Sequence, residues 1–220
     1  MLEPRHILDV KKQQIENNLQ GLFDLVHRAI NDAMACLDGA DKKLCRTVID
    51  RDPELNETRR LLEQDCLVAL ASQQPVAHDL RDIVACMRVA AELERIGDYA
   101  GDIAAGVLQM DGNDLSRLGL PDLVDMAAIC TDMLSKAAEA IARRDAALAR
   151  DTAILDDRVD AAQQKLVQDL FANMQSDPAL VPDASRMLWI AHNLERCGDR
   201  ITNICEQVVF MIRGEDVELN

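Results

Sequence analysis

Two short stretches of the sequence place a pair of carboxylates at helical spacing. They read ELERIGD and NLERCGD, and the second repeats the first at a constant offset along the chain. Glu94 and Asp98 form the pair in the first stretch, and Glu195 and Asp199 form it in the second. On a helix, residues four apart project from the same face, where like charges repel by roughly a few tenths of a kcal/mol. Each pair therefore needs a positive charge beside it.

Two kinds of positive charge could supply this, and the sequence leaves both open. Arg95 and Arg196, or basic residues of neighbouring helices, could pair with the acids and hold a helical bundle together. Alternatively, the carboxylates could bind a metal ion such as Fe, Zn, Mn, Mg or Ca, because hard cations prefer oxygen ligands. We take the four acids as candidate metal ligands and expect them in partly exposed acidic patches, not buried against arginine. The glycine inside each stretch costs a helix about 1 kcal/mol, which indicates close approach of another helix or a ligand.

Further acids could complete such patches. The stretch LDDRVDA contains Asp156 and Asp160, which are again four residues apart. The corresponding positions of the first half are Asp52 and Asn56. An asparagine is a weaker ligand than an aspartate, so the first half is expected to bind metal differently or less well. For each of these residues the alternative is a place on an ordinary solvated helix face.

One histidine stands near a candidate ligand. His192 precedes Glu195 by three residues, whereas the matching position of the first half is Ala91. Ferritin-like di-metal sites use Glu-x-x-His on two helices of one four-helix bundle, and here the order is reversed. We therefore favour a structural role for His192 over a ligand role.

The whole chain has the periodicity of helices. Apolar residues recur at three- and four-residue steps, and no alternating strand pattern is present. The predicted helices cover residues 7–37, 43–72, 76–109, 123–143, 147–174 and 183–212, with a kink or a fresh start at Asp52-Pro53. The fold class is thus all-α, with two tandem antiparallel three-helix bundles over residues 1–112 and 117–220 and a polar linker within 111–122.

Composition narrows the classes of function. The net charge of −15 opposes binding to nucleic acid, and 2% aromatic residues provide no stacking platform for single strands. The seven cysteines form no CxxC pair, so we expect small buried thiols in a reducing cytoplasm. Because the sequence contains no signal peptide and no long apolar run, we expect a soluble cytoplasmic protein that touches membrane complexes only at their periphery.

Several stretches together resemble the PhoU family of phosphate-transport accessory proteins. They are ELERIGD, NLERCGDRITNICE, CLVALASQQPVAHDLR and MIRGED, and they occur in the order and spacing of that family over essentially the whole chain. The resemblance implies two tandem three-helix bundles whose ExxxD pairs hold metal ions on the surface. Glu94, Asp98, Glu195 and Asp199 would then be ligands. Cys197 stands where the family usually has isoleucine, and Asn56 replaces an acid, so we expect the first site to be less fully occupied than the second.

The resemblance also implies a regulatory function. PhoU-like proteins link the phosphate-specific ABC transporter to its sensor histidine kinase and keep the phosphate-starvation (Pho) regulon switched off. The expected partners are therefore that kinase and the transporter ATPase, together with a second copy of the chain in a homodimer. The sequence has no P-loop, dinucleotide fingerprint or GxSxG motif, so we expect no enzyme and no catalytic residues. The alternatives are a ferritin-like di-metal enzyme and a helical adaptor without metal.

Overall fold

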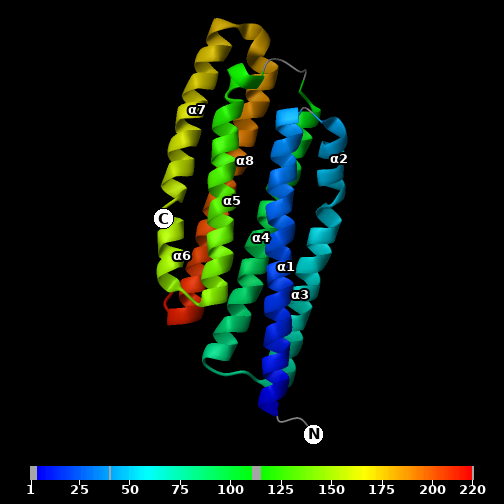
Figure 1. Cartoon of the computed structure of the whole chain (residues 1–220), viewed down its shortest axis with the longest axis vertical. Helices are drawn as coiled ribbons and strands as arrows, with labels where there is room; N and C mark the ends of the chain where they lie inside the picture. The colour runs from blue at the N-terminus through cyan, green and yellow to red at the C-terminus, as the bar shows by residue number, and fades with distance from the viewer. Residues whose placement is uncertain (1–3, 40, 111–114, 220) are drawn as a thin grey trace.

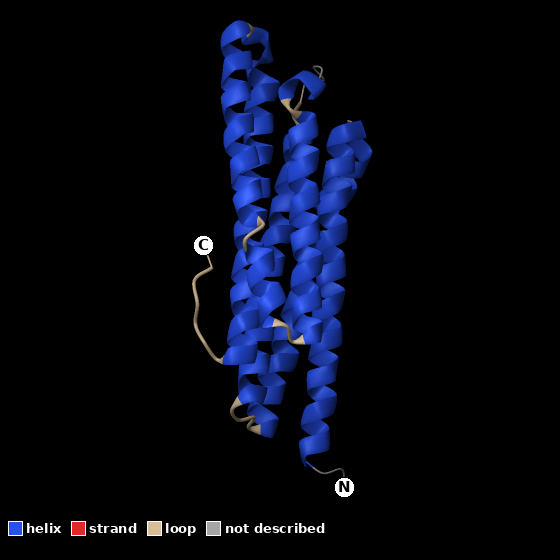
Figure 2. Cartoon of the chain, turned by 60° about the vertical axis from the view of Figure 1, so that its left-hand side comes forward, coloured by secondary structure: helices blue, strands red, loops and turns tan. Residues whose placement is uncertain are grey.

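The computed structural model describes residues 4–39, 41–110 and 115–219, and all regular structure in these ranges is helical (Figures 1 and 2). In chain order the elements are α1 (Pro4–Gly39), α2 (Lys42–Asp50), α3 (Asp52–Gln73), α4 (His78–Leu108), the 3-10 turn η1 (Leu115–Leu118), α5 (Leu120–Arg143), α6 (Ala146–Ala153), α7 (Asp156–Ser176), the 3-10 turn η2 (Pro178–Leu180) and α8 (Val181–Arg213). The predicted all-α class is confirmed.

The second and fifth predicted helices are each divided in two. The break between α2 and α3 falls at Arg51, as the Asp52-Pro53 pair predicts, because a proline is tolerated in the first turn of a new helix. The break between α6 and α7 at Ile154 and Leu155 was not predicted, since no proline or glycine marks it. A new helix starts there with Asp156 and Asp157 in its first turn, where the helix dipole favours negative charge.

The first helix of the second bundle begins earlier than the sequence predicts. Residues 111–114 of the predicted linker lie outside the described residues. After them η1 anchors the chain through the buried Leu118, and Gly119 makes the turn into α5 with a positive φ of 81°. Pro121 then stands in the first turn of α5, which starts at Leu120 instead of Leu123. Much of the predicted linker is thus ordered structure.

The two bundles pack against each other along α4 and α8. In Figure 1, α1 and α5 lie side by side in front of α4 and α8, while α2–α3 and α6–α7 flank them. The buried side chains form one continuous core dominated by Leu, Ile, Val, Ala, Met and Cys. The molecule is therefore two three-helix bundles that share a core.

Polar contacts between α4 and α8 follow the internal repeat. Arg88 donates to Gln207 at 3.1 Å, and the counterparts of these two residues, Trp189 and Gly106, line one surface hollow. Glu92 accepts from Arg200 at 3.2 Å. Arg88 and Glu92 thus face the other bundle and not only solvent. The two helices that carry the repeated stretches, α4 and α8, thus pack against each other with approximate twofold symmetry.

The cysteines differ from their predicted state. Cys36 near the end of α1 and Cys45 on α2 form a disulfide, so the expectation of free thiols throughout is wrong at this pair. The turn between α1 and α2 brings the two together, a proximity that their sequence spacing alone did not indicate. The other five cysteines are buried free thiols, as expected, and burial is the main cause that raises the pKa of Cys66 and Cys130 to about 12.

No helix within the described ranges is both long and apolar enough to cross a membrane.

Candidate functional site

The signature glycines let the preceding helix of each bundle approach closely. A Cβ atom at Gly97 would overlap the Leu55 side chain of α3. At Gly198, a Cβ atom would overlap the Asp156 carboxylate and contact Val159 of α7. The glycines therefore make room for a neighbouring helix, which is one of the two reasons that the sequence suggested. This contact sets α3 beside the first carboxylate pair and α7 beside the second.

In the first repeat, Asp52 of α3 faces Asp98 of α4. Glu94 and Asp98 are both partly exposed. Burial raises the pKa of Asp52, and the charge of Asp98 together with a side-chain hydrogen bond between the two carboxyl groups raises it further. Asn56 Nδ2 donates to Asp52 Oδ2 at 2.8 Å. The structure thus brings together all four residues that the sequence assigned to this patch.

A fourth acid of the first patch was not predicted from the sequence. Asp102 lies one helical turn after Asp98, and burial and then the charge of Asp98 raise the pKa of Asp102. Its spacing of four residues was available as a signal.

Arginines neutralise much of the first patch. Arg59 of α3 places its Nε atom 3.4 Å from Glu94 Oε1, and Arg95 places a guanidinium nitrogen 3.2 Å from Asp98 Oδ2. We expected these acids to be partly exposed and not buried against arginine; Glu94 and Asp98 are partly exposed, but each pairs with an arginine. The ion pairs follow the other alternative, in which basic residues of the same and neighbouring helices balance the repulsion.

The second patch contains three mutually close carboxylates. Burial raises the pKa of Glu195, and so do the negative charges of Asp199 and Asp160. Burial and the charge of Asp199 likewise raise the pKa of Asp160. His192 Nδ1 lies 3.5 Å from Glu195 Oε2, and Arg196 pairs with Asp199 at 2.7 Å. Asp199 therefore pairs with a partly exposed arginine, while Glu195 faces a histidine.

Asp156 lies inside the bundle. Only 4% of its surface is exposed, and Thr202 Oγ1 donates to its Oδ2 atom at 3.3 Å. The alternative that Asp156 lies on a solvated helix face is therefore wrong. Its carboxylate contributes to the packing of α7 on α8 below the surface patch of Asp160, Glu195 and Asp199.

The two patches do not fit a metal ion equally well. Within the described residues, no group of three or more His, Cys, Asp or Glu side chains is arranged as a ready set of ligands. The second patch comes nearer, because the charges of Asp199 and Asp160 act on Glu195 and the His192 imidazole lies beside it, but its side chains do not form a ready set of ligands either. The first patch does not fit, since Arg59 already occupies the side of Glu94 that faces α3.

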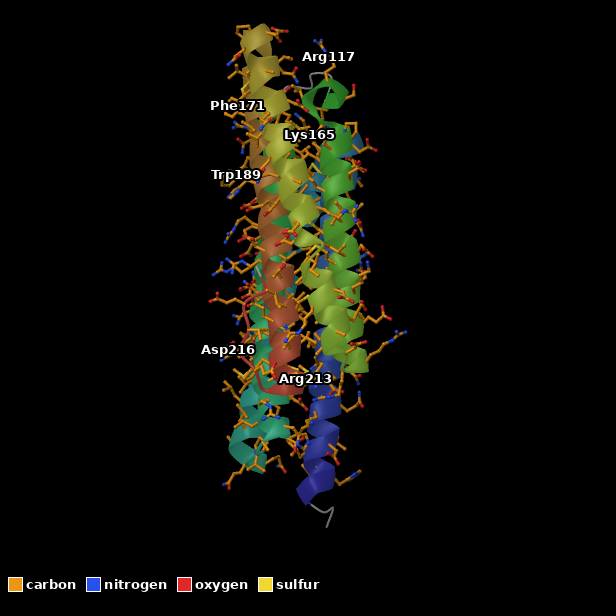
Figure 3. The ribbon with its side chains drawn as sticks, turned by 90° about the vertical axis from the view of Figure 1, so that its left-hand side faces the viewer. Arg117, Lys165, Phe171, Trp189, Arg213 and Asp216 are labelled. Carbon is orange, nitrogen blue, oxygen red and sulfur yellow. A yellow bond between two sulfur atoms is a disulfide. The ribbon has the colours of Figure 1, made fainter. Side chains whose placement is uncertain are left out.

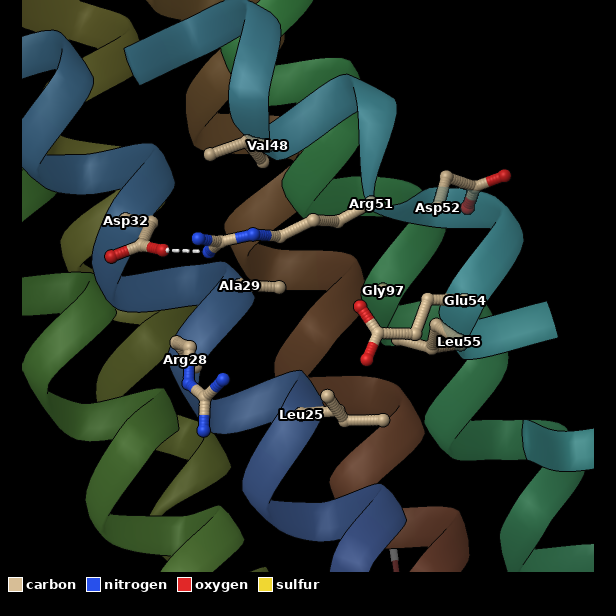
Figure 4. Close-up of a pocket in the computed structure, with 10 residues that line it drawn as sticks. All are labelled: Leu25, Arg28, Ala29, Asp32, Val48, Arg51, Asp52, Glu54, Leu55 and Gly97. Carbon is tan, nitrogen blue, oxygen red and sulfur yellow. Dashed lines mark hydrogen bonds and ion pairs between the residues drawn. The ribbon is translucent and has the colours of Figure 1, made fainter. Parts of the chain in front are cut away.

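A small pocket borders the first patch beside the break between α2 and α3 (Figure 4). Its volume is about 40 Å³, enough for water but not for an organic ligand. Arg51 of the break pairs with Asp32 of α1 at 2.6 Å across it, and Asp52 and Gly97 lie at its edge. The pocket is a packing gap at the break between α2 and α3. It adjoins the first patch but adds no room for an organic ligand.

An ion cluster around the buried Asp82, which was not predicted from the sequence, joins the two bundles, and its Arg144 side chain is partly exposed. Asp82 of α4 accepts from Lys12 of α1 at 2.8 Å and from Arg144, at the end of α5, at 2.9 Å. Burial alone would raise the pKa of Asp82, but the hydrogen bonds from Arg144 and Lys12 outweigh it and lower the pKa below its ordinary value. The cluster borders a cavity of about 440 Å³ between the bundles. No short-range pattern connects these three residues.

Comparison with known proteins places both bundles in one family. Residues 19–107 and 123–208 each match the PhoU domain. The phosphate-specific transport system accessory protein PhoU homolog of Pseudomonas aeruginosa is 32% identical over 205 residues, which cover 93% of this chain and 85% of that protein. The homolog of Streptococcus pneumoniae is 32% identical over 219 residues, which cover 98% of this chain and 100% of that protein. The crystal structure of the phosphate transport system regulatory protein PhoU from Streptococcus pneumoniae superposes with a TM-score of 0.89 at 30% identity, over 96% of this chain and 99% of that one.

Proposed function

This chain belongs to the PhoU family, and we propose that it is a negative regulator of the phosphate-starvation (Pho) regulon. In this role it couples the phosphate-specific ABC transporter to a sensor histidine kinase and holds the kinase in its non-activating state when phosphate is plentiful. It acts in the cytoplasm as a homodimer and touches the kinase and the transporter ATPase at the membrane. The family consists of accessory and regulatory proteins and not of enzymes.

The observation that carries this proposal is the whole-chain match to PhoU proteins in sequence and fold. Both repeats match, and the alignments cover more than nine-tenths of the chain. A protein of this kind acts by occupying the surface of a partner. With a net charge of −15, it should bind basic surfaces most readily, and its encounter rate should fall as salt shortens the Debye length to about 8 Å and below.

A deletion strain tests the proposal. Loss of the protein should switch on phosphate-starvation genes in phosphate-rich medium, and a plasmid copy should restore repression. A reporter fusion read in rich and poor phosphate measures both effects. Starvation genes that remain fully repressible in the deletion strain would overturn the proposal, once any second PhoU-type gene has been removed as well.

Metal binding forms the second part of the proposed function. A bound ion would neutralise the carboxylates of Glu195, Asp199 and Asp160; Glu94 and Asp98 are the corresponding acids of the first repeat, where Arg59 competes with an ion for Glu94. The support is that burial and then the charges of neighbouring acids raise the pKa of Glu195 and Asp160. Elemental analysis of untagged protein tests it. A variant with all four signature acids changed to Gln or Asn should lose the metal and keep its helical content.

One observation favours a metal-free adaptor as the second candidate. Arg59, Arg95 and Arg196 already pair with three of the four signature acids, which balances much of the charge without an ion. An adaptor of this kind would regulate the kinase equally well in a chelator. A metal-free preparation that binds its partners with unchanged affinity would therefore favour the adaptor and leave the regulatory proposal intact.

A further inference from the structure

We propose that the Cys36–Cys45 disulfide is a reversible redox lock on α2, which opens by thiol–disulfide exchange while the protein stays folded. The disulfide joins the end of α1 to the short helix α2. Closed, it holds α2 against α1, and open, it leaves α2 to its non-covalent contacts alone. Such a lock adds a response to thiol redox state to the regulatory role proposed above.

The second repeat builds the same turn without a disulfide. In the first repeat, Asp41 caps the start of α2, and its N–H group donates to the Cys36 carbonyl at 3.1 Å. In the second repeat, Asp145 caps the start of α6, and its N–H group donates to the Ala140 carbonyl at 2.9 Å. The alanine thus takes the place of the first cysteine in an otherwise matching turn.

The second cysteine also has an alanine as its counterpart. The Cys45 N–H group donates to the Asp41 carbonyl at 3.0 Å, and the Ala149 N–H group donates to the Asp145 carbonyl at 3.2 Å. Ala149 is fully buried, as Cys45 is, and it packs there without a covalent link. The turn therefore does not depend on the disulfide. A bond that the fold can do without can open and close while the helices remain in place.

Few buried side chains hold α2 apart from the disulfide. The helix has nine residues, and its fully covered side chains are those of Cys45 and Val48. An isolated helix shorter than about 12–15 residues is marginal in water, so α2 depends on what fastens it to the bundle. Local opening is most frequent where few buried contacts oppose it. Cleavage of the disulfide should therefore let α2 open more often.

Release of α2 should reach the edge of the first patch. The residue after α2 is Arg51, which pairs with Asp32 of α1 at 2.6 Å (Figure 4). The next residue is Asp52, which faces Asp98 in the first patch. Because α2 holds Arg51 in place, an open α2 should free Arg51 from Asp32 more often. The redox state of two buried sulfur atoms is thereby linked to one surface of the protein.

The exchange takes glutathione or a dithiol as its co-reactant. A reductant thiolate attacks one sulfur of the Cys36–Cys45 bond, which breaks as the mixed disulfide forms, and the released cysteine sulfur takes up a proton. A second reductant thiol then displaces the other cysteine. The chain gains two thiols, and the reductant leaves as its own disulfide. Both cysteine sulfurs belong to fully buried residues, so attack should follow local opening of α2.

The five free cysteines of the described chain should not interfere. All five are buried, and burial raises the pKa of each of them, so the thiolate form that attacks a disulfide is scarce. In a cytoplasm, disulfides are mostly of the redox-sensing or catalytic kind. Only the cellular occurrence of the switch rests on the cytoplasmic location in the proposed function, because its chemistry can be measured on purified protein.

The two turns lie in different places and can be followed separately. α1 and α5 lie side by side and run in opposite directions, so the α1–α2 turn is at the upper end of this pair in Figure 1 and the α5–α6 turn is at its lower end. Figure 3 shows the second turn near Arg213, the last residue of α8. The α5–α6 turn is thus an internal control for the first.

The test is hydrogen exchange of the full chain, oxidised and after reduction by dithiothreitol, read by mass spectrometry. On reduction, the amides of residues 42–50 should exchange about tenfold to a hundredfold faster, because the open state is no longer cross-linked. The amides of residues 146–153 should not change. Excess reduced glutathione should open the bond in the native protein and oxidised glutathione should restore it, as counted by alkylation.

A reciprocal pair of double variants tests the role of the bond itself. Cys36→Ala with Cys45→Ala copies the second turn into the first, and its residues 42–50 should exchange as in the reduced chain and ignore dithiothreitol. Ala140→Cys with Ala149→Cys should form a second disulfide and slow the exchange of α6. Circular dichroism reports whether each variant folds, and the unaltered chain in its two redox states provides the test if one does not.

Three outcomes would overturn the lock. They are equal exchange of residues 42–50 in the two redox states, a bond that glutathione opens only in denaturant, and loss of helix in both bundles on reduction. The last outcome would mean that the fold needs the disulfide. None of them bears on the regulation of phosphate-starvation genes, which the deletion strain tests independently.

Discussion

Gly198 of α8 lies so close to Asp156 of α7 that a Cβ atom at position 198 would overlap the Asp156 carboxylate. Because Thr202 holds this buried carboxylate, it cannot move aside at low cost. Gly198→Ala should therefore destabilise the protein by about 1–3 kcal/mol, in spite of the better helix propensity of alanine. Chemical unfolding measures the change.

Gly21 supplies the matched control for this prediction. It lies on the exposed side of α1, where an added Cβ atom would meet nothing within 4 Å. Gly21→Ala should raise the free energy of unfolding by about 0.5–1 kcal/mol. Equal effects of the two substitutions would contradict the close approach of α7 at Gly198.

The Asp82 cluster should make stability depend on acid pH. The folded pKa of Asp82 lies below its ordinary value of 3.8, so its stabilising contribution is complete above about pH 4 and is lost as the pH falls through the folded pKa. Asp82→Asn removes the buried partner of an ion cluster and should cost about 3 kcal/mol at pH 7. Unfolding curves at pH 7 and at pH 2.5–3 should show the difference shrinking at the lower pH. A constant difference across this range would argue against the ion pairs.

Counting reactive thiols should detect the Cys36–Cys45 disulfide. Of the seven cysteines, five should react with a thiol reagent in denatured, unreduced protein, and all seven should react after reduction. Closure of so short a loop contributes about 2.5 kcal/mol in the chain-entropy treatment, so Cys36→Ala should destabilise the oxidised protein by roughly that amount. Seven reactive thiols in protein purified under air and alkylated at once would show that the pair is reduced.

The pair formed by Glu92 and Arg200 should couple the two bundles. Both side chains are about three-quarters buried, with 22% and 25% of their surface exposed. A double-mutant cycle with Glu92→Gln and Arg200→Gln should give a coupling energy of about 0.5–1 kcal/mol. The exposed pair Glu57–Arg60, which lies within α3, should give less and should be more sensitive to salt. A coupling energy no larger than that of the control would show that this pair does not stabilise the packing of the two bundles.

Local patterns predicted the helices, and they also indicated that Asp52 lies beside Asp98. Asp98 and Asp52 meet because Gly97 admits α3, and both the glycine and the four-residue spacings are visible in the sequence. The break before α7 could not be predicted, because it depends on where the buried Asp156 must sit against α8 and not on a helix-breaking residue.

Contacts between residues far apart in the chain explain the remaining differences. The approach of Arg59 to Glu94 depends on the rotation of α3 about its own axis, which tertiary packing determines. The same holds for Lys12 and Arg144, which reach Asp82 from two other helices. Helix periodicity shows which face of a helix is buried, but not which charged side chain of another helix lies across from it.

The packing of α4 against α8 has a consequence for how such a protein can evolve. The two repeats meet as the subunits of a symmetric dimer would, with Arg88 beside Gln207 and their counterparts Trp189 and Gly106 sharing one hollow. A dimer of one short gene product would have to carry two identical patches, because a single mutation would alter both. Covalent fusion of the repeats removes that constraint, so Arg59 could appear on one side and His192 on the other while the shared interface stayed the same.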